Sequence, residues 1–271
     1  MKKCAIYINI CDDNLKDYEI LSLNRIIDLY CNNDNYDLLF HLPNTIDFNK
    51  LLNKYLDNNI KTKCYNDNYK NVLCYKDNEL LFESVNAYNN MLSLNQNFYG
   101  NFVNYYNYML TYQLDGYIFD NQLEYFLNKK YDYIGGYYLP VYANLIKYNE
   151  YENINTEHHL IMNSGVSLKK LSFCIESIQQ NYKNFIKGIE FNNIHAYIND
   201  DDFFSMFYTT EVNTLDSIRF SLNYSGAETH YAINNFQYPF CCHAFHKSRF
   251  LQKLIENYNK EHNLDYYKYI K

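Results

Sequence analysis

The stretch YNYMLTYQLDGYIFDNQLEYFLNKKYDYIGGYY, residues 106–138, carries the clearest structural signal in the sequence. An apolar and aromatic run of strand length, Tyr108–Tyr112, stops at a polar tip, Gln113–Gly116. Leu123–Leu127 then has the three- and four-residue apolar spacing of a helix face, and Tyr133–Gly135 is a second short strand. This order of strand, helix and strand predicts an α/β sheet.

The polar tip lies where such sheets bind ligands, at the carboxyl end of a strand. Gln113 and Asp115 occupy alternate positions of an extended chain, so their side chains are expected to point the same way. A carboxylate at Asp115 can hold a hard divalent cation, and that cation can hold a diphosphate. A simple turn at Asp115-Gly116, or a helix cap, explains the same residues without a ligand.

The N-terminal half alternates between strand-like and helix-like patterns, which is typical of a doubly wound sheet. Strands are predicted at Cys4–Ile10, Tyr36–Leu42, Ile60–Tyr65 and Asn71–Tyr75, and helices at Glu19–Tyr30, Phe48–Leu56 and Leu80–Leu94.

The C-terminal half is less regular. Pro140–Glu157 is polar and is predicted to be a surface loop able to fold over a substrate, and a turn is predicted at Gly165. Helices are predicted at Lys169–Tyr182, Phe203–Tyr208 and Lys247–Tyr258, and strands at Ile194–Asn199 and Ile218–Tyr224. We expect one α/β domain over residues 1–271, with a central mixed, mostly parallel sheet flanked by helices.

The net charge and the cysteine content indicate which binding partners and which cellular compartment to expect. A formal charge of −7 without a Lys/Arg block counts against nucleic acid as partner and against a polybasic membrane anchor. The 8 Cys contain no Cys-x-x-Cys pair, and Cys4 and Cys74 lie in apolar runs, which predicts reduced, buried thiols in a cytoplasmic protein. The apolar run after Lys3 is too short for a signal peptide or a transmembrane span. Any membrane contact, at the inner face, would be peripheral, and the oligomeric state stays open.

Four polar clusters stand at the ends of ordered runs: Gln113/Asp115, Asn163-Ser164-Gly165, Asp200-Asp201-Asp202 and His243. Each has a structural explanation on its own. The second can be a turn, the third a solvated helix start and the fourth a core histidine.

Taken in order, these clusters belong to six motifs, which are NFY at Asn97–Tyr99, YQLD at Tyr112–Asp115, YDYIG at Tyr131–Gly135, NSGVSLK at Asn163–Lys169, DDDFF at Asp200–Phe204 and PFCCH at Pro239–His243. In this order they resemble a family of bacterial and viral proteins regarded as sugar transferases of the GT-A glycosyltransferase fold. The family pattern has an aromatic motif, Gln-x-Asp, Tyr-Asp-Tyr-Ile-Gly, Asn-Gly-Gly-x-Ser-Leu-Arg, Glu-Asp-x-x-Phe and Pro-Phe-x-x-His. The resemblance covers roughly Glu83–Lys247.

The resemblance implies a GT-A-like (Rossmann-like) fold that moves a sugar from a nucleotide-diphosphate sugar, most simply a UDP-sugar, to a glycan or lipid-linked acceptor. It places donor binding in residues 1–138 and acceptor binding in residues 139–271. It also implies a manganese or magnesium ion held by Asp115 and His243. Only one carboxylate is present in this motif, because it begins with Gln113.

The resemblance also implies the other site residues, by matching positions of this sequence to the family motifs. The donor is expected at Gln113, Asp115, Asn163, Ser164, Gly165 and Lys247. An inverting transfer needs a base for the acceptor hydroxyl, and Asp201 matches that role, with Asp200 as its support or as an acceptor ligand. Ser164 replaces a family glycine, Asp200 a glutamate and Lys169 an arginine.

Three alternatives remain open from the sequence. A zinc site at Cys241, Cys242, His243 and His246 would need adjacent cysteines to ligate together, which structural zinc sites rarely do. A sugar nucleotidyltransferase would share the fold class, but Ile10–Lys16 lacks the glycines of its phosphate loop. A non-catalytic binding protein on a degenerate transferase fold is compatible with the three replacements.

Overall fold

The computed structural model describes residues 2–66, 70–77, 95–138, 162–191 and 200–264. Its centre is a six-stranded sheet with strand order β3-β2-β1-β4-β7-β6. The strands are β1 (Lys2–Asn9), β2 (Tyr36–Pro43), β3 (Val72–Asp77), β4 (Tyr106–Tyr112), β6 (Tyr133–Tyr137) and β7 (Met162–Lys170). Neighbours from β3 to β4 are parallel, whereas β7 is antiparallel to both β4 and β6, which confirms a mixed, mostly parallel sheet.

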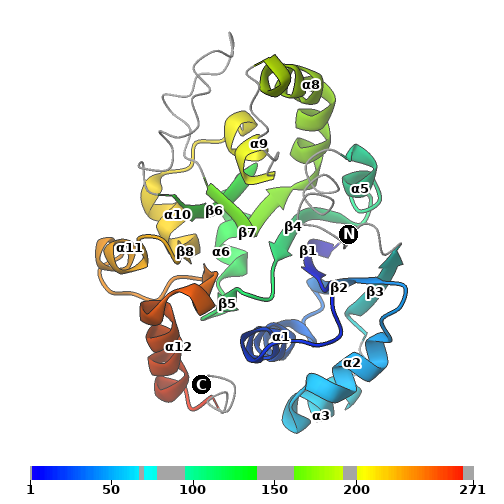
Figure 1. Cartoon of the computed structure of the whole chain (residues 1–271), viewed down its shortest axis with the longest axis vertical. Helices are drawn as coiled ribbons and strands as arrows, with labels where there is room; N and C mark the ends of the chain where they lie inside the picture. Colours follow the sequence, from blue (N-terminus) through cyan, green and yellow to red (C-terminus); the bar gives the residue numbers. More distant parts are fainter. Residues whose placement is uncertain (1, 67–69, 78–94, 139–161, 192–199, 265–271) are drawn as a thin grey trace.

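Helices flank this sheet, as expected. In Figure 1, α5, α8 and α9 lie above the sheet, and α1, α2, α3 and α12 lie below it. The helices are α1 (Asp17–Tyr30), α2 (Phe48–Tyr55), α3 (Asn58–Asn66), α5 (Gln96–Gly100), α6 (Leu123–Lys129), α8 (Leu171–Phe191), α9 (Asp200–Phe207), α10 (Thr214–Phe220), α11 (Ala227–Ile233) and α12 (Arg249–Glu261). Within the described residues, no helix combines the length and the apolar character needed to cross a membrane.

A smaller sheet with strand order β5-β9-β8 packs beside the main one and brings the C-terminal part of the chain to the tip of β4. Its strands are β5 (Tyr117–Ile118), β8 (Ser221–Asn223) and β9 (Cys241–His243). Between β9 and α12 lies the short 3-10 helix η3 (Phe245–Lys247).

The core follows directly from the apolar runs. Ile6 and Ile8 of β1 and Leu38 and Leu39 of β2 have no exposed surface. A strand covered on both faces needs apolar residues at consecutive positions, which explains why these strands are continuous runs rather than alternating patterns.

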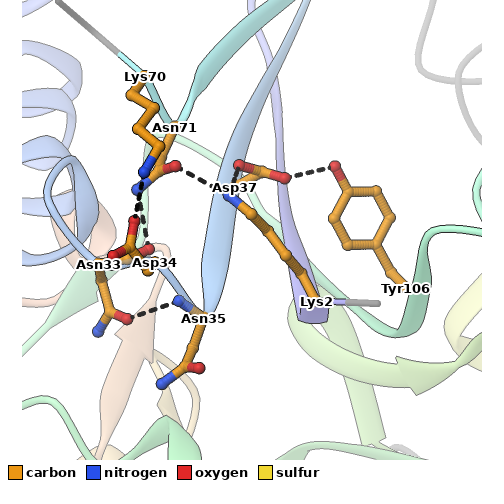
Figure 2. A network of polar contacts seen from close by, with 8 residues as sticks. All are labelled: Lys2, Asn33, Asp34, Asn35, Asp37, Lys70, Asn71 and Tyr106. Atoms are coloured by element: carbon orange, nitrogen blue, oxygen red, sulfur yellow. Dashed lines mark hydrogen bonds and ion pairs between the residues drawn. The ribbon is translucent and has the colours of Figure 1, made fainter.

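A polar network joins the amino ends of the parallel strands. Figure 2 shows the Lys2 Nζ donating to Asp37 Oδ1 at 2.5 Å and to Asn71 Oδ1 at 2.8 Å, while the Tyr106 hydroxyl donates to Asp37 Oδ2 at 2.7 Å. These residues stand at or next to the starts of β1, β2, β3 and β4. The network therefore aligns adjacent strands at the edge opposite the polar tip of β4.

Three predictions of secondary structure are wrong, and Cys74, predicted to be a buried thiol, is exposed. Ile60–Tyr65 belongs to helix α3, because Asp57 accepts from the Asn59 N–H at 3.0 Å and starts a helix there. The expected turn at Gly165 lies inside the continuous strand β7. The expected strand Ile218–Tyr224 is instead the end of α10 followed by β8, since Asn213 caps α10 through the Asp216 N–H at 2.7 Å.

The elements expected at Leu80–Leu94, Pro140–Glu157 and Ile194–Asn199 lie outside the described residues.

Candidate functional site

The tip of β4 meets two other segments at the carboxyl edge of the sheet. The Gln113 N–H donates to the Gly165 carbonyl of β7 at 2.9 Å, and the Phe245 N–H donates to the Asp115 carbonyl at 3.3 Å. Pairing of β5 with β9 places Tyr117 opposite Cys242, so His243 is carried to the same place. Three of the four predicted polar clusters therefore contribute to one site.

His243 lies between the two polar side chains of the β4 tip. Its Nε2 is 3.2 Å from Gln113 Oε1 and 3.2 Å from Asp115 Oδ1. His246 approaches the other carboxylate oxygen, with Nδ1 3.8 Å from Asp115 Oδ2. The His246 ring is stacked on Tyr18 of α1, with centroids 4.3 Å apart.

This group is largely buried and incompletely hydrogen-bonded. The side chains of His243 and Asp115 are 11% and 21% exposed. Asp115 Oδ1, His243 Nδ1 and His246 Nδ1 are buried and make no hydrogen bond. Because buried polar atoms are normally paired, these atoms mark a place suited to a ligand.

The electrostatics favour a carboxylate at Asp115. Burial acts to raise the pKa of Asp115, but the neighbouring His243, His246 and Lys247 outweigh burial and hold that pKa below its ordinary value. Asp115 is therefore ionised at neutral pH, the form in which it can hold a cation.

The two predicted metal ligands, Asp115 and His243, lie together at the tip of β4. Among the described residues, no group of three or more His, Cys, Asp or Glu side chains is arranged to hold a metal ion. Asp115 and His243 by themselves are suitable ligands, and the Gln113 amide oxygen lies beside them. Two protein ligands suit a cation whose other positions are filled by diphosphate oxygens and water, as is common for magnesium.

The zinc alternative finds no support in this part of the chain. Cys241 and Cys242 have no exposed surface, and burial raises the pKa of both thiols. The Cys241 thiol donates to the Phe220 carbonyl at 3.0 Å. These thiols are packed as small apolar groups, which opposes the thiolate that zinc requires.

Gly165 contacts the histidine from the other side. A β-carbon at this position would lie 2.1 Å from His243 Nε2. The sequence predicted glycine here for a turn, whereas the structure requires it because the imidazole ring occupies the space.

Asn163 and Ser164 are held by tertiary contacts. Asn163 Oδ1 accepts from the Gly165 N–H at 2.9 Å, and its Nδ2 donates to the Tyr138 hydroxyl at 2.6 Å. The Ser164 hydroxyl donates to Asp200 Oδ1 at 2.7 Å. The Asn163–Gly165 segment thus joins the β4 tip to the acidic cluster of α9.

Asp200 and Asp201 differ in surroundings. Asp200 is 2% exposed, and its Oδ2 lies 2.6 Å from the Nζ of the fully buried Lys169. Both carboxylate oxygens of Asp200 are therefore engaged, which fits support better than proton transfer. Asp201 is half-buried in the first turn of α9, and after burial its charge and that of Asp200 raise the pKa of Tyr133. The Asp202 side chain lies outside the described residues.

Lys247 is exposed, with its Nζ 5.4 Å from the centroid of the Tyr224 ring, and it contributes to the low pKa of Asp115. The sequence did not assign His246 to this site, although its place three residues after His243 was a usable signal. Tyr18 gave no signal, because its contact with His246 joins residues far apart in the chain.

A cavity of about 370 Å³ lies at the amino ends of β1 and β4, with Lys3, Tyr106, Glu124 and Lys170 in its wall. None of the predicted site residues lines it. We place the candidate site at the carboxyl edge rather than in this cavity, since Gln113, Asp115 and His243 come together there.

Solved structures with a similar fold are glycosyltransferases. The chain superposes on the galactosyltransferase LgtC in complex with donor and acceptor sugar analogs with a TM-score of 0.52 and 13% identity, covering 88% of this chain and 86% of that one. Mouse xyloside xylosyltransferase 1 gives a TM-score of 0.49 and 11% identity over 89% of this chain and 96% of that one. The first likeness shows that the chain has the GT-A glycosyltransferase fold.

No curated protein matches the sequence. A family model described as "Protein of unknown function (DUF5672)" matches residues 71–243, the range that holds all six motifs. Since this range exceeds half of the 271 residues, the chain belongs to that family of proteins of unknown function.

Proposed function

We propose that this protein is a glycosyltransferase that moves a sugar from a nucleotide-diphosphate sugar, a UDP-sugar in the first instance, to a glycan or lipid-linked acceptor. The observation that carries the proposal is the convergence of Gln113, Asp115 and His243 at the carboxyl edge of the sheet, where His243 Nε2 lies 3.2 Å from both Gln113 Oε1 and Asp115 Oδ1. This edge is the usual ligand position in an α/β sheet, and the GT-A fold is consistent with sugar transfer.

Donor binding is assigned to the β4 tip and the β7 segment. Asp115 and His243 would hold a manganese or magnesium ion, whose positive charge would stabilise the departing diphosphate. Lys247 adds a positive charge nearby, consistent with its effect on the pKa of Asp115. Gln113 and the Asn163–Gly165 segment would contact the donor.

Asp201 is assigned as the base. The acceptor oxygen bonds to the anomeric carbon while the bond from that carbon to the diphosphate oxygen breaks. The electron pair leaves with the diphosphate, and the acceptor proton passes to Asp201. Attack opposite the leaving group inverts the anomeric configuration. Asp200 is assigned as the support of Asp201 and not as the base, because both of its oxygens already have partners.

The further assignments extend the same proposal. Residues 1–138 would form the donor half and residues 139–271 the acceptor half. No disulfide joins the cysteines of the described part of the chain, which fits the reducing conditions of the cytoplasm.

A thermal-shift panel tests the donor site. UDP-, GDP- and CMP-sugars and the free nucleotides are each added with MnCl₂ or with EDTA. A metal-dependent rise in Tm with one nucleotide class is expected, and Asp115→Asn should abolish it. The matched control Asp120→Asn, at an exposed carboxylate, should keep it. A nucleotide response that ignores metal would remove the metal from the proposal, and no response to any nucleotide would contradict the donor site.

A non-catalytic binding protein on the same fold is the second candidate, because Asp200 is held in an ion pair. The variant Asp201→Asn distinguishes the transferase from the binding protein. If it no longer releases nucleotide but keeps the donor-induced rise in Tm, the protein is an enzyme and Asp201 takes part in the reaction. A wild-type protein that binds the donor and releases no nucleotide with any acceptor supports the binding protein.

A further inference from the structure

Lys169 is a charged residue with no exposed surface, placed in the middle of the fold. Its Nζ lies 2.6 Å from Asp200 Oδ2 and 3.3 Å from Thr111 Oγ1. The same Nζ lies 5.4 Å from the centroid of the Phe204 ring. One ammonium group therefore connects β4, β7 and α9.

Each oxygen of the Asp200 carboxylate has a partner. Oδ2 faces Lys169, and Oδ1 accepts from the Ser164 hydroxyl at 2.7 Å. Lys169 and Ser164 both belong to β7, so the first residue of α9 is attached to that strand at two points. Two directional contacts fix the orientation of a carboxylate more narrowly than apolar packing does.

Fixing Asp200 also fixes the residue that follows it. In an α-helix, successive side chains point about 100° apart, so the direction of Asp201 is set once the first turn is oriented. Asp201 follows Asp200 in the first turn of α9, and this helix packs on β7, the strand that carries Lys169 and Ser164. Asp201 is therefore next to the point where the ion pair attaches α9 to β7.

Stability alone does not require this arrangement. Replacing a buried ion pair with apolar residues of similar size is often neutral or stabilising, whereas removing one partner is strongly destabilising. The geometry that a buried pair imposes is then a reason for its presence that stability alone does not give.

We propose that Lys169 is a positioning residue: through Asp200 it holds the first turn of α9 so that Asp201 is directed toward the acceptor hydroxyl. The role of Asp201 rests on the proposed function, whereas the attachment of α9 to β7 by the Lys169–Asp200 pair can be tested without a substrate.

The first experiment follows hydrogen–deuterium exchange of the α9 amides, residues 200–207, with α12, residues 249–261, as internal control. Lys169→Met should speed exchange in α9 at least tenfold and leave α12 unchanged. Asp200→Asn, which keeps the side-chain size and can still accept from Ser164, should show a smaller change in the same direction and serves if Lys169→Met does not fold. Unchanged exchange in α9 in a folded variant would overturn the proposal.

The second experiment measures UDP release from UDP-glucose and UDP-galactose with MnCl₂. The apolar double variant Lys169→Met/Asp200→Leu should regain the Tm lost in Lys169→Met, yet show a kcat at least a hundredfold below wild type with KM for the donor within threefold. Lys169→Arg, which keeps the charge, should recover kcat to within tenfold.

The outcomes separate this proposal from the proposed function. Recovery of kcat together with Tm in the apolar double variant would show a purely structural role and overturn the positioning role. If the wild type releases UDP from neither donor, the transferase assignment for UDP-hexoses fails, and the α9 exchange decides whether the ion pair holds the helix.

Discussion

Individual residues at the site are constrained by contacts rather than by local conformation. Gly165 is the clearest case, because a β-carbon there would lie 2.1 Å from the nitrogen of His243 that faces Asp115 and Gln113. Any side chain at position 165 has to displace this imidazole ring.

Gly165→Ala is therefore expected to lower the free energy of unfolding by about 1–3 kcal/mol, the usual cost of overpacking a buried position. It should also abolish the metal-dependent Tm rise with donor. Gly100→Ala is the matched control, because no atom lies within 4 Å of a β-carbon at that position. Chemical denaturation measures the free energy of unfolding of both variants. A Gly165→Ala protein with wild-type stability and donor response would contradict the close contact with His243.

His230 is a second residue whose environment is informative. It is 1% exposed, neither ring nitrogen makes a hydrogen bond, and burial lowers its pKa. The unfolded chain therefore binds a proton at His230 at higher pH than the folded chain does. Stability from this residue is fully present above the unfolded pKa of about 6.5 and is lost as pH falls toward the lower folded pKa.

His230→Leu should raise the free energy of unfolding at pH 7.5 by about 1 kcal/mol, because it removes an unsatisfied buried polar group. It should also reduce the loss of stability between pH 7.5 and 5.5, measured by urea denaturation. An unaltered pH dependence in His230→Leu would show that this histidine titrates normally.

At the scale of elements, the small sheet has to be held against the main one for His243 to reach the tip of β4. Arg25 of α1, which is 4% exposed, contributes to this. Its guanidinium donates to the Ile118 carbonyl at 2.8 Å, to the Phe119 carbonyl and to the Tyr258 hydroxyl of α12 at 3.3 Å. One side chain therefore links α1, the end of β5 and α12.

Arg25→Met should lower the free energy of unfolding by about 3 kcal/mol, because it removes the charged donors from two backbone carbonyl groups in a buried place. It should also weaken the donor-induced Tm rise, since the position of β9 depends on β5. Arg25→Lys, which keeps the charge but lacks the two separate donor nitrogens of the guanidinium, should fall between Arg25→Met and wild type. Equal stability of the three proteins in urea denaturation would contradict this role.

For the molecule as a whole, the two ends of the parallel strands carry different groups of polar residues. The polar network of Lys2, Asp37, Asn71 and Tyr106 lies at the amino edge, as Figure 2 shows, whereas the candidate site lies at the carboxyl edge. Stability and donor binding should be separable by changes at these two edges.

Asp37→Asn should lower the free energy of unfolding by about 1–2 kcal/mol, because Lys2 and Tyr106 lose a charged acceptor. The metal-dependent Tm rise with donor should keep its wild-type size. A donor response reduced as strongly as in Asp115→Asn would show that the amino edge also takes part in binding.

The elements that were predicted correctly are those with long, unambiguous apolar patterns. The continuous run of β1, the broad apolar stripe of α1 and the strand–tip–helix order around β4 all specify their structure locally. The strand prediction for Ile60–Tyr65 was wrong because a short run with few apolar residues fits a strand or a helix equally well. The cap at Asp57 favours the helix.

The sequence by itself determined the α/β class, the main apolar strands β1, β2 and β4 with helices α1 and α2, and the polar tip of β4, because each of these depends on neighbouring residues. Only the tertiary structure decided that Lys169 pairs with Asp200, that Gly165 makes room for His243 and that His246 joins Asp115. A local pattern encodes which residues will be buried or polar, but not which distant residue will be their partner. That choice is made when strands and helices pack, since every buried polar group then has to find a donor or acceptor across the chain.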